Sequence, residues 1–284
     1  MHITLVTCLE MPALIPEDAL FRTALETRRA TVSIAPWNGP FSPFQKTDLV
    51  VIRTPWDYTA HATKFKRWLD DLEADNMLVS NPVPLMRWNM NKTYLMDLQK
   101  KGAPLPPTLV ARPEVTEIQA AAANLGLEEM VIKPVISASS KGLARLAPYK
   151  RRMLEQALTG ITCDMLVQAF VPEIETLGET SLVFLAGEFS HAVCKRPKAG
   201  DIRCQEEFGG SAELVTPPSW AVARAKELLT LLPAPADYAR VDVIIRADDL
   251  ILMEIELIEP ELFFRLAPEA AELFARQITQ GRQA

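Results

Sequence analysis

The chain has 284 residues, of which 49% are hydrophobic and 23% are charged, a composition that suits one large globular domain or two to three small lobes. Its net charge of −6 argues against a general nucleic-acid or anionic-membrane binder, although local basic patches could hold a phosphate ligand. No segment approaches the roughly 20 apolar residues of a membrane span, and the first residues read as a strand and not as a signal peptide. We therefore expect a cytoplasmic protein without nucleic-acid or membrane partners.

The cysteines and histidines indicate no metal site. Four cysteines are scattered without a Cys-x-x-Cys pair, so reduced thiols are expected, with neither a zinc site nor a disulfide framework. The three histidines offer no ligand pair at helical spacing. His191 lies in a predicted strand beside a basic cluster, where a structural role is favoured over a substrate contact.

Residues 1–90 read as alternating strands and helices. Such alternation indicates a parallel α/β lobe. The predicted strands cover residues 3–7, 31–35, 49–52 and 78–81, and the predicted helices cover residues 17–28 and 63–73.

The rest of the chain predicts two α+β lobes. A helix over residues 92–101 is closed by Gly102, and three prolines at 104, 106 and 107 then mark a boundary and force an extended crossing. The next predicted elements are a strand from residue 108, a helix at 120–127, a strand at 130–134, a helix at 152–158 and a strand at 165–171. They are followed by strands at 180–185 and 188–194, a helix at 220–231, an acidic hairpin and a helix at 268–280. The predicted domains are residues 1–90 and 91–284, the second divided into lobes at 104–170 and 171–284.

The acidic hairpin is the most informative segment. Two apolar runs carry Arg240, Asp242, Glu254 and Glu256 at alternating positions, and side chains two apart on a strand share a face. A three-residue loop at 247–249 would set Asp242 opposite Glu254 and Arg240 opposite Glu256. Like charges this close need a counter-charge, so the pattern predicts hard cations such as Mg2+, against the alternative of a solvent-facing sheet surface.

Two lysines and a small-residue loop predict a phosphate site. Lys133 closes an apolar run before a proline, and burying such a lysine is costly unless it meets an anion. The loop that follows contains Ser139, Ser140 and Gly142, whose small size would let backbone N–H groups approach a phosphate. Lys92 is the second lysine of this pair. Taken alone, the loop is also compatible with an ordinary connection.

The strand at 165–171 passes into a proline-terminated bend, a connection that can open backbone groups to a flat base between two lobes. Glu173, Glu175 and Glu179 follow. One of them could hold ribose hydroxyls, although surface acids remain the alternative for the first two.

A basic segment at 194–210 carries Lys195, Arg196 and Arg203 and ends in two glycines. Arginine suits bidentate contact with carboxylate or phosphate, so this segment could bind an acid substrate, the alternative being a solvated loop. In the first lobe, Arg53 ends an apolar strand. Since functional groups in open α/β sheets gather at the carboxyl ends of strands, Arg53, Trp56 and Asp57 are candidate substrate contacts.

The ordered set of motifs resembles the ATP-grasp superfamily over about residues 90–265. The motifs are Lys92, Val131-Ile-Lys-Pro134, the loop to Gly142, Val167-Gln-Ala-Phe170, Gly178-Glu179, Arg240-Val-Asp242 and Glu254-Ile-Glu256. Among its subgroups, the chain is most similar to glutathione-synthetase-like ligases. The resemblance implies an ATP-grasp fold whose 104–170 lobe is the lid and whose 171–284 lobe is catalytic.

The resemblance also implies a reaction, in which ATP phosphorylates an acid to an acyl phosphate that an amine attacks to give an amide, ADP and phosphate. By analogy, Lys92 and Lys133 would grip the phosphates, Glu179 the ribose, and Gln168, Ala169, Phe170 and Val171 the adenine. Asp242, Glu254 and Glu256 would hold Mg2+, or Mn2+ as a substitute. Arg240 would stabilise the transferred phosphate, Arg196 and Arg203 would hold the acid, and Lys195 would contact substrate. The partners implied are a small-molecule carboxylate and an amine, and a homodimer is expected from family habit.

Two departures from the family pattern limit what carries over. Many members have Glu-x-Asn where this chain has Glu254-Ile-Glu256, and often an Arg where Ser181 stands. A Glu can still ligate Mg2+, so metal binding is expected, but the acid substrate is expected to contact other residues. The alternatives are an ATP-grasp kinase that stops at phosphorylation and a non-catalytic nucleotide-binding regulatory protein.

Overall fold

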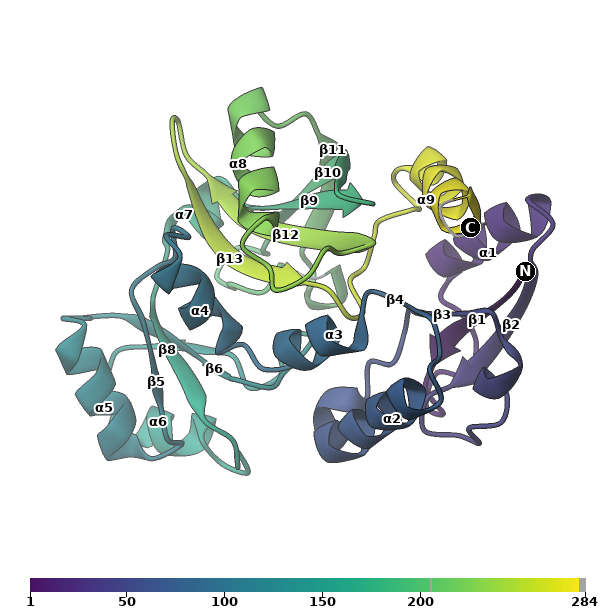
Figure 1. Cartoon of the computed structure of the whole chain (residues 1–284). Helices are drawn as coiled ribbons and strands as arrows, with labels where there is room; N and C mark the ends of the chain where they lie inside the picture. Colours follow the sequence, from purple (N-terminus) through teal and green to yellow (C-terminus); the bar gives the residue numbers. More distant parts are fainter. Residues whose placement is uncertain (205, 281–284) are drawn as a thin grey trace.

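Three β-sheets, each with its own helices, organise the chain, which is described here from a computed structural model covering residues 1–204 and 206–280 (Figure 1). The first sheet is parallel and the other two are antiparallel. This confirms the predicted fold class of a parallel α/β lobe followed by two α+β lobes. No helix in the described residues is long and apolar enough to cross a bilayer.

The first sheet has the order β2-β1-β3-β4, with β1 (His2–Thr7), β2 (Thr31–Pro36), β3 (Leu49–Ile52) and β4 (Val79–Ser80). All four residues of β3 are buried, as expected for a central strand covered on both faces. The helices of this region are α1 (Pro16–Thr27), η1 (Phe44–Lys46), η2 (Tyr58–His61), α2 (Ala62–Ala74), α3 (Val83–Asn89) and α4 (Tyr94–Lys100). Helix α3 was not predicted.

The second sheet has the order β5-β8-β6-β7, with β5 (Thr108–Ala111), β6 (Met130–Pro134), β7 (Ala144–Leu146) and β8 (Met165–Ala169). Helices α5 (Val115–Asn124) and α6 (Arg151–Ala157) share a buried cluster with it. Strand β7 was not predicted, and α5 begins and ends earlier than expected.

The third sheet has the order β11-β10-β9-β12-β13. Its strands are β9 (Glu179–Leu185), β10 (Glu188–Arg196), β11 (Ser211–Val215), β12 (Tyr238–Ile245) and β13 (Leu250–Glu256). The helices are α7 (Glu173–Thr176), η3 (Glu206–Phe208) and α8 (Ser219–Leu229). Apolar residues of α4 and α8 pack on one face of this sheet, which leaves the alternate residues of β12 and β13 for the opposite face.

The β12–β13 hairpin has the predicted pairing at its acidic end, with Asp242 opposite Glu254 and Arg240 opposite Glu256. The predicted three-residue loop is wrong. Ile245 pairs with Leu250, so the loop has one residue more, and it is closed by the Arg246 N–H donating to the Asp249 carbonyl at 2.7 Å. A bulge between Asp242 and Val243 offsets that extra residue and restores the expected register.

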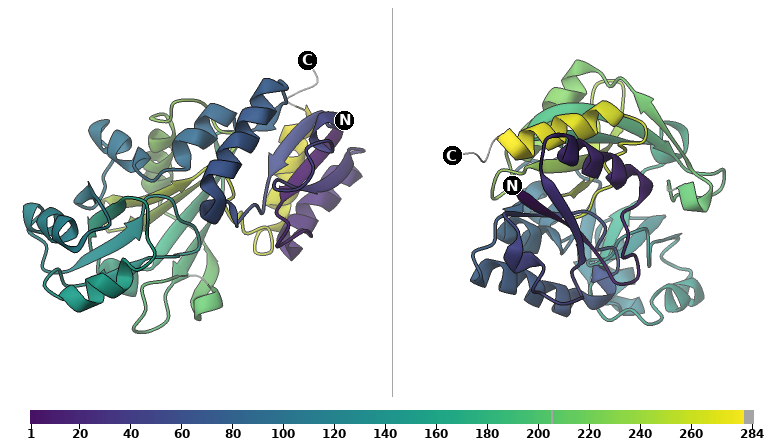
Figure 2. Two further views of the ribbon diagram at one scale, coloured as in Figure 1. Left: turned by 90° about the horizontal axis from the view of Figure 1, so that it is seen from below. Right: turned by 90° about the vertical axis from the view of Figure 1, so that its right-hand side faces the viewer.

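The last helix, α9 (Pro268–Gln280), returns to the first lobe and lies beside α1 (Figure 2). The rings of Phe21 and Phe274 stack with their centroids 4.7 Å apart, and both belong to a core that also contains residues of β1 and β3. Although sequence continuity grouped residues 268–280 with the last lobe, their apolar face therefore completes the core of the first.

Candidate active site

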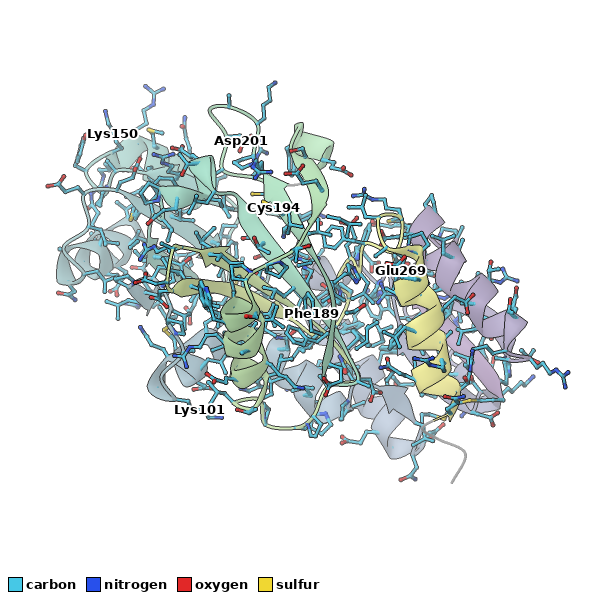
Figure 3. The ribbon with its side chains drawn as sticks, turned by 90° about the horizontal axis from the view of Figure 1, so that it is seen from above. Lys101, Lys150, Phe189, Cys194, Asp201 and Glu269 are labelled. Atoms are coloured by element: carbon cyan, nitrogen blue, oxygen red, sulfur yellow. The ribbon has the colours of Figure 1, made fainter. Side chains whose placement is uncertain are left out.

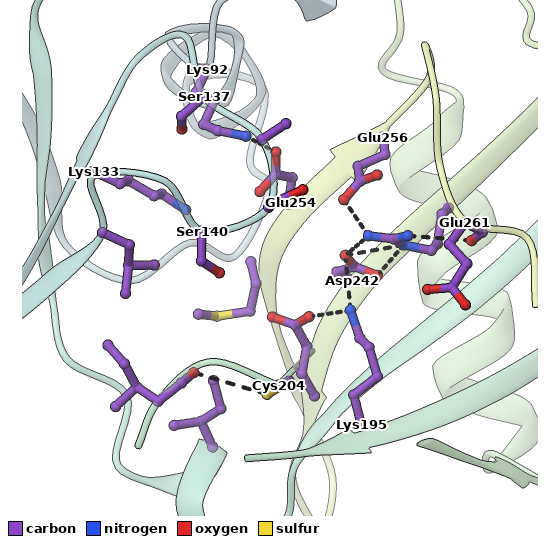
Figure 4. A pocket seen from close by; sticks show the side chains of 18 of the residues that line it. Lys92, Lys133, Ser137, Ser140, Lys195, Cys204, Asp242, Glu254, Glu256 and Glu261 are labelled. Carbon is purple, nitrogen blue, oxygen red and sulfur yellow. Dashed lines mark hydrogen bonds and ion pairs between the residues drawn. The ribbon is translucent and has the colours of Figure 1, made fainter. Parts of the chain in front are cut away.

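A cavity of about 420 Å3 is lined by residues of all three regions (Figure 4). Most of the residues predicted as site residues line it, and they come from strands and from the segments that connect the elements. They are Trp56, Lys92, Lys133, Ser139, Ser140, Gln168, Ala169, Phe170, Val171, Glu179, Lys195, Arg240, Asp242, Glu254 and Glu256.

A network of ion pairs covers the wall formed by β9, β10 and β12. The Asp242 carboxylate accepts a hydrogen bond from Ser181 Oγ at 2.6 Å and pairs with Arg240 Nη2 at 3.0 Å. Lys195 Nζ lies 2.6 Å from Glu179 and 3.4 Å from Asp242. Although burial raises the pKa of Asp242, the Arg240 and Lys195 charges outweigh it, and its pKa falls below the ordinary value. Asp242 is therefore held ionised.

The two glutamates of β13 face the same cavity. Lys92 pairs with Glu254, and Arg240 pairs with Glu256. For Glu254, burial is outweighed by the charges of Lys92 and Lys133, so its pKa is lowered. For Glu256, burial dominates, and with Asp242 and Glu254 close by its pKa is raised to about 7. This glutamate would be stabilised as a carboxylate by a further cation.

Lys133 differs from the other cavity cations because no hydrogen bond or ion pair holds its ammonium among the described residues. The side chain is only 8% exposed, and burial, with Lys92 nearby, lowers its pKa. Figure 4 shows it directed into the cavity opposite Glu254. A buried ammonium without an anionic partner is poised to receive one.

The loop after β6 brings backbone close to Lys133. Ser139 and Ser140 both have positive φ, at 50° and 55°, and Gly142 follows at 74°. A Cβ on Gly142 would lie 2.7 Å from a side-chain carbon of Pro134, so only glycine fits this close return of the loop onto β6. Gly142 does not line the cavity itself, and its role is to shape the loop that carries the two serines.

The end of β8 forms a flat apolar part of the cavity. Gln168 donates from Nε2 to Thr108 Oγ1 at 2.9 Å and thereby ties β8 to β5. The Arg145 guanidinium lies 3.6 Å from the centroid of the Phe170 ring and also pairs with Glu175. Since Glu173 pairs with Arg246, only Glu179 of the three candidate ribose contacts lines the cavity.

Comparison with known proteins identifies this arrangement. Residues 91–260, more than half of the chain, match the family described as "Prokaryotic glutathione synthetase, ATP-grasp domain", and residues 3–81 match "D-cycloserine synthetase DcsG, N-terminal domain". The chain belongs to the ATP-grasp family. It is an ATP-dependent carboxylate–amine ligase, as its sequence predicts.

Individual relatives agree with this membership. The chain is 27% identical over 275 residues to "Cycloserine biosynthesis protein DcsG" of Streptomyces lavendulae, covering 90% of this chain and 91% of the relative. It is 31% identical over 192 residues to a glutathione synthetase of Prochlorococcus marinus (strain MIT 9313), covering 64% and 57%. The crystal structure of D-cycloserine synthetase DcsG superposes with a TM-score of 0.86 at 24% identity, covering 99% of both chains.

Within this ATP-grasp ligase, the structure does not bring Arg53 and Asp57 to the cavity. Arg53 is 1% exposed, and it donates from Nε to Asp18 at 2.8 Å and from Nη2 to the Pro260 carbonyl at 3.0 Å. Asp57 accepts hydrogen bonds from Trp37 Nε1 and Asn38 Nδ2, both at 2.6 Å. Their expected substrate contacts are corrected to internal structural contacts, because both side chains are held by partners outside the cavity.

Arg196 and Arg203 also lie outside the cavity lining. Arg196 pairs with Glu213 across β10 and β11, and Arg203 pairs with Asp201 at 2.6 Å while its guanidinium covers the Phe208 ring at 3.9 Å. Figure 3 shows Asp201 on the projecting loop that follows β10. The expected acid-binding role of these two arginines is corrected, because each pairs with an acidic side chain outside the cavity lining.

Several cavity residues were missed from the sequence. They are Tyr58, Glu259, Glu261 and Arg265. The sequence did contain a signal for two of them. The segment Glu254-Ile-Glu-Leu-Ile-Glu259-Pro-Glu261 is rich in acidic residues, and Glu259 and Glu261 follow the strand. His191, by contrast, has the structural role that was favoured, since its Nε2 donates to the Leu262 carbonyl at 2.9 Å and it does not line the cavity.

The three predicted metal ligands form an ion-pair network in this structure. Over residues 1–204 and 206–280, no group of three or more His, Cys, Asp or Glu side chains is gathered closely enough to hold a metal ion. Asp242, Glu254 and Glu256 nevertheless share one face of β12 and β13, and carboxylate oxygens are the donors that Mg2+ prefers. Burial raises the pKa of Glu256, and a cation bound at this face would stabilise its carboxylate, so the donor set fits a hard cation.

Proposed function

We propose that the cavity binds ATP with Mg2+ and joins a small-molecule carboxylate to an amine through an acyl phosphate, releasing ADP and phosphate. The observation that carries this proposal is Lys133, a buried ammonium directed into the cavity without an anionic partner among the described residues. A polyphosphate is the ligand that would satisfy it.

The nucleotide would lie between the second and third sheets. Lys92 and Lys133 would hold the phosphates, and the serine loop before Gly142 would cover them with backbone N–H groups. Residues 168–171 would receive the adenine, where Phe170 offers a ring already backed by a guanidinium. Glu179 would accept hydrogen bonds from the ribose hydroxyls.

Asp242, Glu254 and Glu256 would hold Mg2+, or Mn2+ in its place. When bound, the metal neutralises phosphate charge as the phosphoryl group moves. Arg240, already within this network, would then stabilise charge on the transferred phosphate, and Lys195 would contact the substrate near Glu179. Closure of the second lobe over the cavity would exclude water from the acyl phosphate.

The substrates we propose are amino-acid-like small molecules. Similar proteins are named cycloserine biosynthesis protein, glutathione synthetase and D-alanine–D-alanine ligase, and the last name states an amino acid. Trp56 lines the cavity on the side of the first lobe and would contact the substrate. A homodimer and a cytoplasmic location stay predictions of the sequence.

The test is an incubation of the protein with ATP, Mg2+ and pools of D- and L-amino acids and small peptides. Nucleotides and adduct masses are then identified together by mass spectrometry. We expect ADP, free phosphate and a product lighter by one water than the sum of its parents. ADP with a stable phosphorylated product would identify a kinase instead, and ATP binding without turnover on any pool would favour the regulatory alternative.

A further inference from the structure

One part of the cavity is not used by the proposed nucleotide and metal contacts. Trp56 and Tyr58 follow β3 of the first lobe, and Glu259 follows β13 of the third sheet. Trp56 Nε1 donates to the main-chain carbonyl of Glu259 at 3.4 Å, which fixes the two segments against each other. Two aromatic side chains and one carboxylate therefore border the same space.

Glu259 differs from the acidic side chains near the proposed phosphate site, because those face cationic side chains. Near the proposed phosphate site, equal numbers of cationic and anionic side chains face one another: Lys92, Lys133, Lys195 and Arg240, against Glu179, Asp242, Glu254 and Glu256. Farther along, Glu261 pairs with Arg265 at 3.3 Å. No ion pair with a described residue holds Glu259, so a cationic group of a ligand would supply the counter-charge that stabilises its carboxylate form.

The environment of Glu259 also raises the pKa of its carboxyl group. Burial and the nearby Glu256 raise its pKa to about 8, while Lys92 and a hydrogen bond from the Tyr58 hydroxyl act in the opposite direction. A carboxylate that titrates near neutral pH can accept a proton from an ammonium group and release it again.

Resting on the function proposed above, we infer that Trp56, Tyr58 and Glu259 form the subsite of the attacking amine, with Glu259 as its general base. The aromatic rings and the carboxylate receive the ammonium form of a primary amine, as such groups do for cations elsewhere. The ligand class is thus a primary ammonium compound, and the acid and phosphates occupy the remainder of the cavity.

The step balances without any further reagent. The ammonium nitrogen loses one proton to Glu259, and its freed electron pair forms the bond to the acyl carbon. The bond between that carbon and the phosphate oxygen then breaks, and its electron pair leaves with the phosphate. The nitrogen gives up its second proton to the departing phosphate, and Glu259 returns its own proton to water.

Hydroxylamine separates this role from the earlier phosphorylation step, because it is already unprotonated near neutral pH and needs no base to attack an acyl phosphate. Wild-type protein is incubated with ATP, Mg2+ and pools of D- and L-amino acids, with and without hydroxylamine. Amides and hydroxamates are quantified by mass. We expect E259Q to form amide at least 100-fold more slowly, while hydroxamate forms within about threefold of the wild-type rate.

Two outcomes would overturn the inference. If E259Q loses hydroxamate and amide formation equally, the residue serves the acid, the nucleotide or the metal. If it loses neither, it has no role in the amine step. Wild-type protein that forms neither product from any pool would refute the proposed function itself, which is a different result from both. E269Q, at an exposed position of α9 (Figure 3), is the matched control and should behave as wild type.

A second variant keeps the test meaningful if E259Q fails to fold. Y58F keeps the ring and removes the hydroxyl that lowers the pKa of Glu259, so the rise of amide kcat/KM with pH should move to higher pH. Other charged groups that influence Glu259 are Lys92, Glu254 and Glu256, and Y58F leaves all of them in place. An unchanged pH profile in this variant would contradict the base assignment.

Discussion

Two ion pairs of this molecule have nearly the same chemistry but differ in how deeply they are buried. Arg53 and Asp18 are 1% and 0% exposed, and the Arg53 guanidinium lies over the rings of Tyr238 and Phe264. Lys92 and Glu254 are 12% and 22% exposed and border the cavity. The first pair is sealed by protein on all sides, whereas the second remains within reach of a ligand.

The enclosed ion pair serves the stability of the fold, whereas the pair at the cavity wall can serve ligand binding. A charge enclosed by the core must keep its partner, because an unpaired charge there raises the free energy of the folded state by several kcal/mol. A charge at a cavity wall can exchange its partner for a ligand. Variants of enclosed charges should therefore lose stability, and variants of charges at the cavity wall should lose activity.

The largest effect is expected for Lys133→Met. Removing this ammonium takes away a phosphate contact and leaves no buried carboxylate unpaired, so ADP formation should fall roughly 100- to 1000-fold while the melting temperature is kept or rises. Initial rates of ADP release and thermal unfolding measure the two effects. Lys150→Met, which removes an exposed lysine of the same lobe, is the control. Turnover close to wild type would refute the phosphate assignment of Lys133.

Arg53→Met should do the reverse. It leaves Asp18 buried without its partner, so the free energy of unfolding should fall by about 3 kcal/mol, while activity per folded molecule changes little. Urea titration measures the loss, and the double variant with Asp18→Leu should recover much of it. A normal urea midpoint together with a raised substrate KM would instead restore Arg53 as a substrate contact.

Glu17 extends this comparison to the pH dependence of folding stability. Burial, with Glu261 and Asp18 nearby, raises its pKa from 4.5 to about 8. Between these values the unfolded chain loses a proton that the folded protein keeps, so this group makes stability fall as pH rises from about 4.5 to 8. Glu17→Gln should remove that fall and be more stable than wild type at pH 8.5 by roughly 2 kcal/mol. Unfolding curves with parallel pH dependence in both proteins would contradict the assignment.

The smallest effect is expected for Arg145→Ala. Its guanidinium covers the Phe170 ring but is partly exposed, so its loss should weaken ATP binding only about two- to fivefold. Equilibrium ATP titration measures this. Arg151→Ala, a surface arginine on α6, should leave ATP affinity unchanged. Equal affinities in the two variants would mean that Phe170 needs no support.

The three-lobe fold and the acidic hairpin were predictable because both follow from local periodicity. Alternation alone placed Arg240, Asp242, Glu254 and Glu256 on one face, and the β12–β13 register confirms that pairing. The loop length was not predictable, because a bulge absorbed the extra residue. Strands β7 and β11 were missed because their sequences, Ala-Arg-Leu and Ser-Ala-Glu-Leu-Val, contain few strongly strand-forming residues.

The sequence did not reveal which ion-pair partners the charged residues would have. Arg53, Arg196 and Arg203 each had the chemistry to bind an acid, but nothing local revealed that Asp18, Glu213 and Asp201 would hold them. Glu259 presents the opposite case. Its place in the cavity depends on β3 and β13 ending near each other, which is a property of the tertiary structure and not of either segment.

The packing of α9 against α1 has a consequence for synthesis on the ribosome. Phe21 emerges early, yet its stacking partner Phe274 lies about 250 residues later, a delay of roughly 10 to 50 s at ordinary elongation rates. Until then the first lobe keeps an apolar face uncovered. The first lobe therefore completes folding only after the second and third sheets have been made.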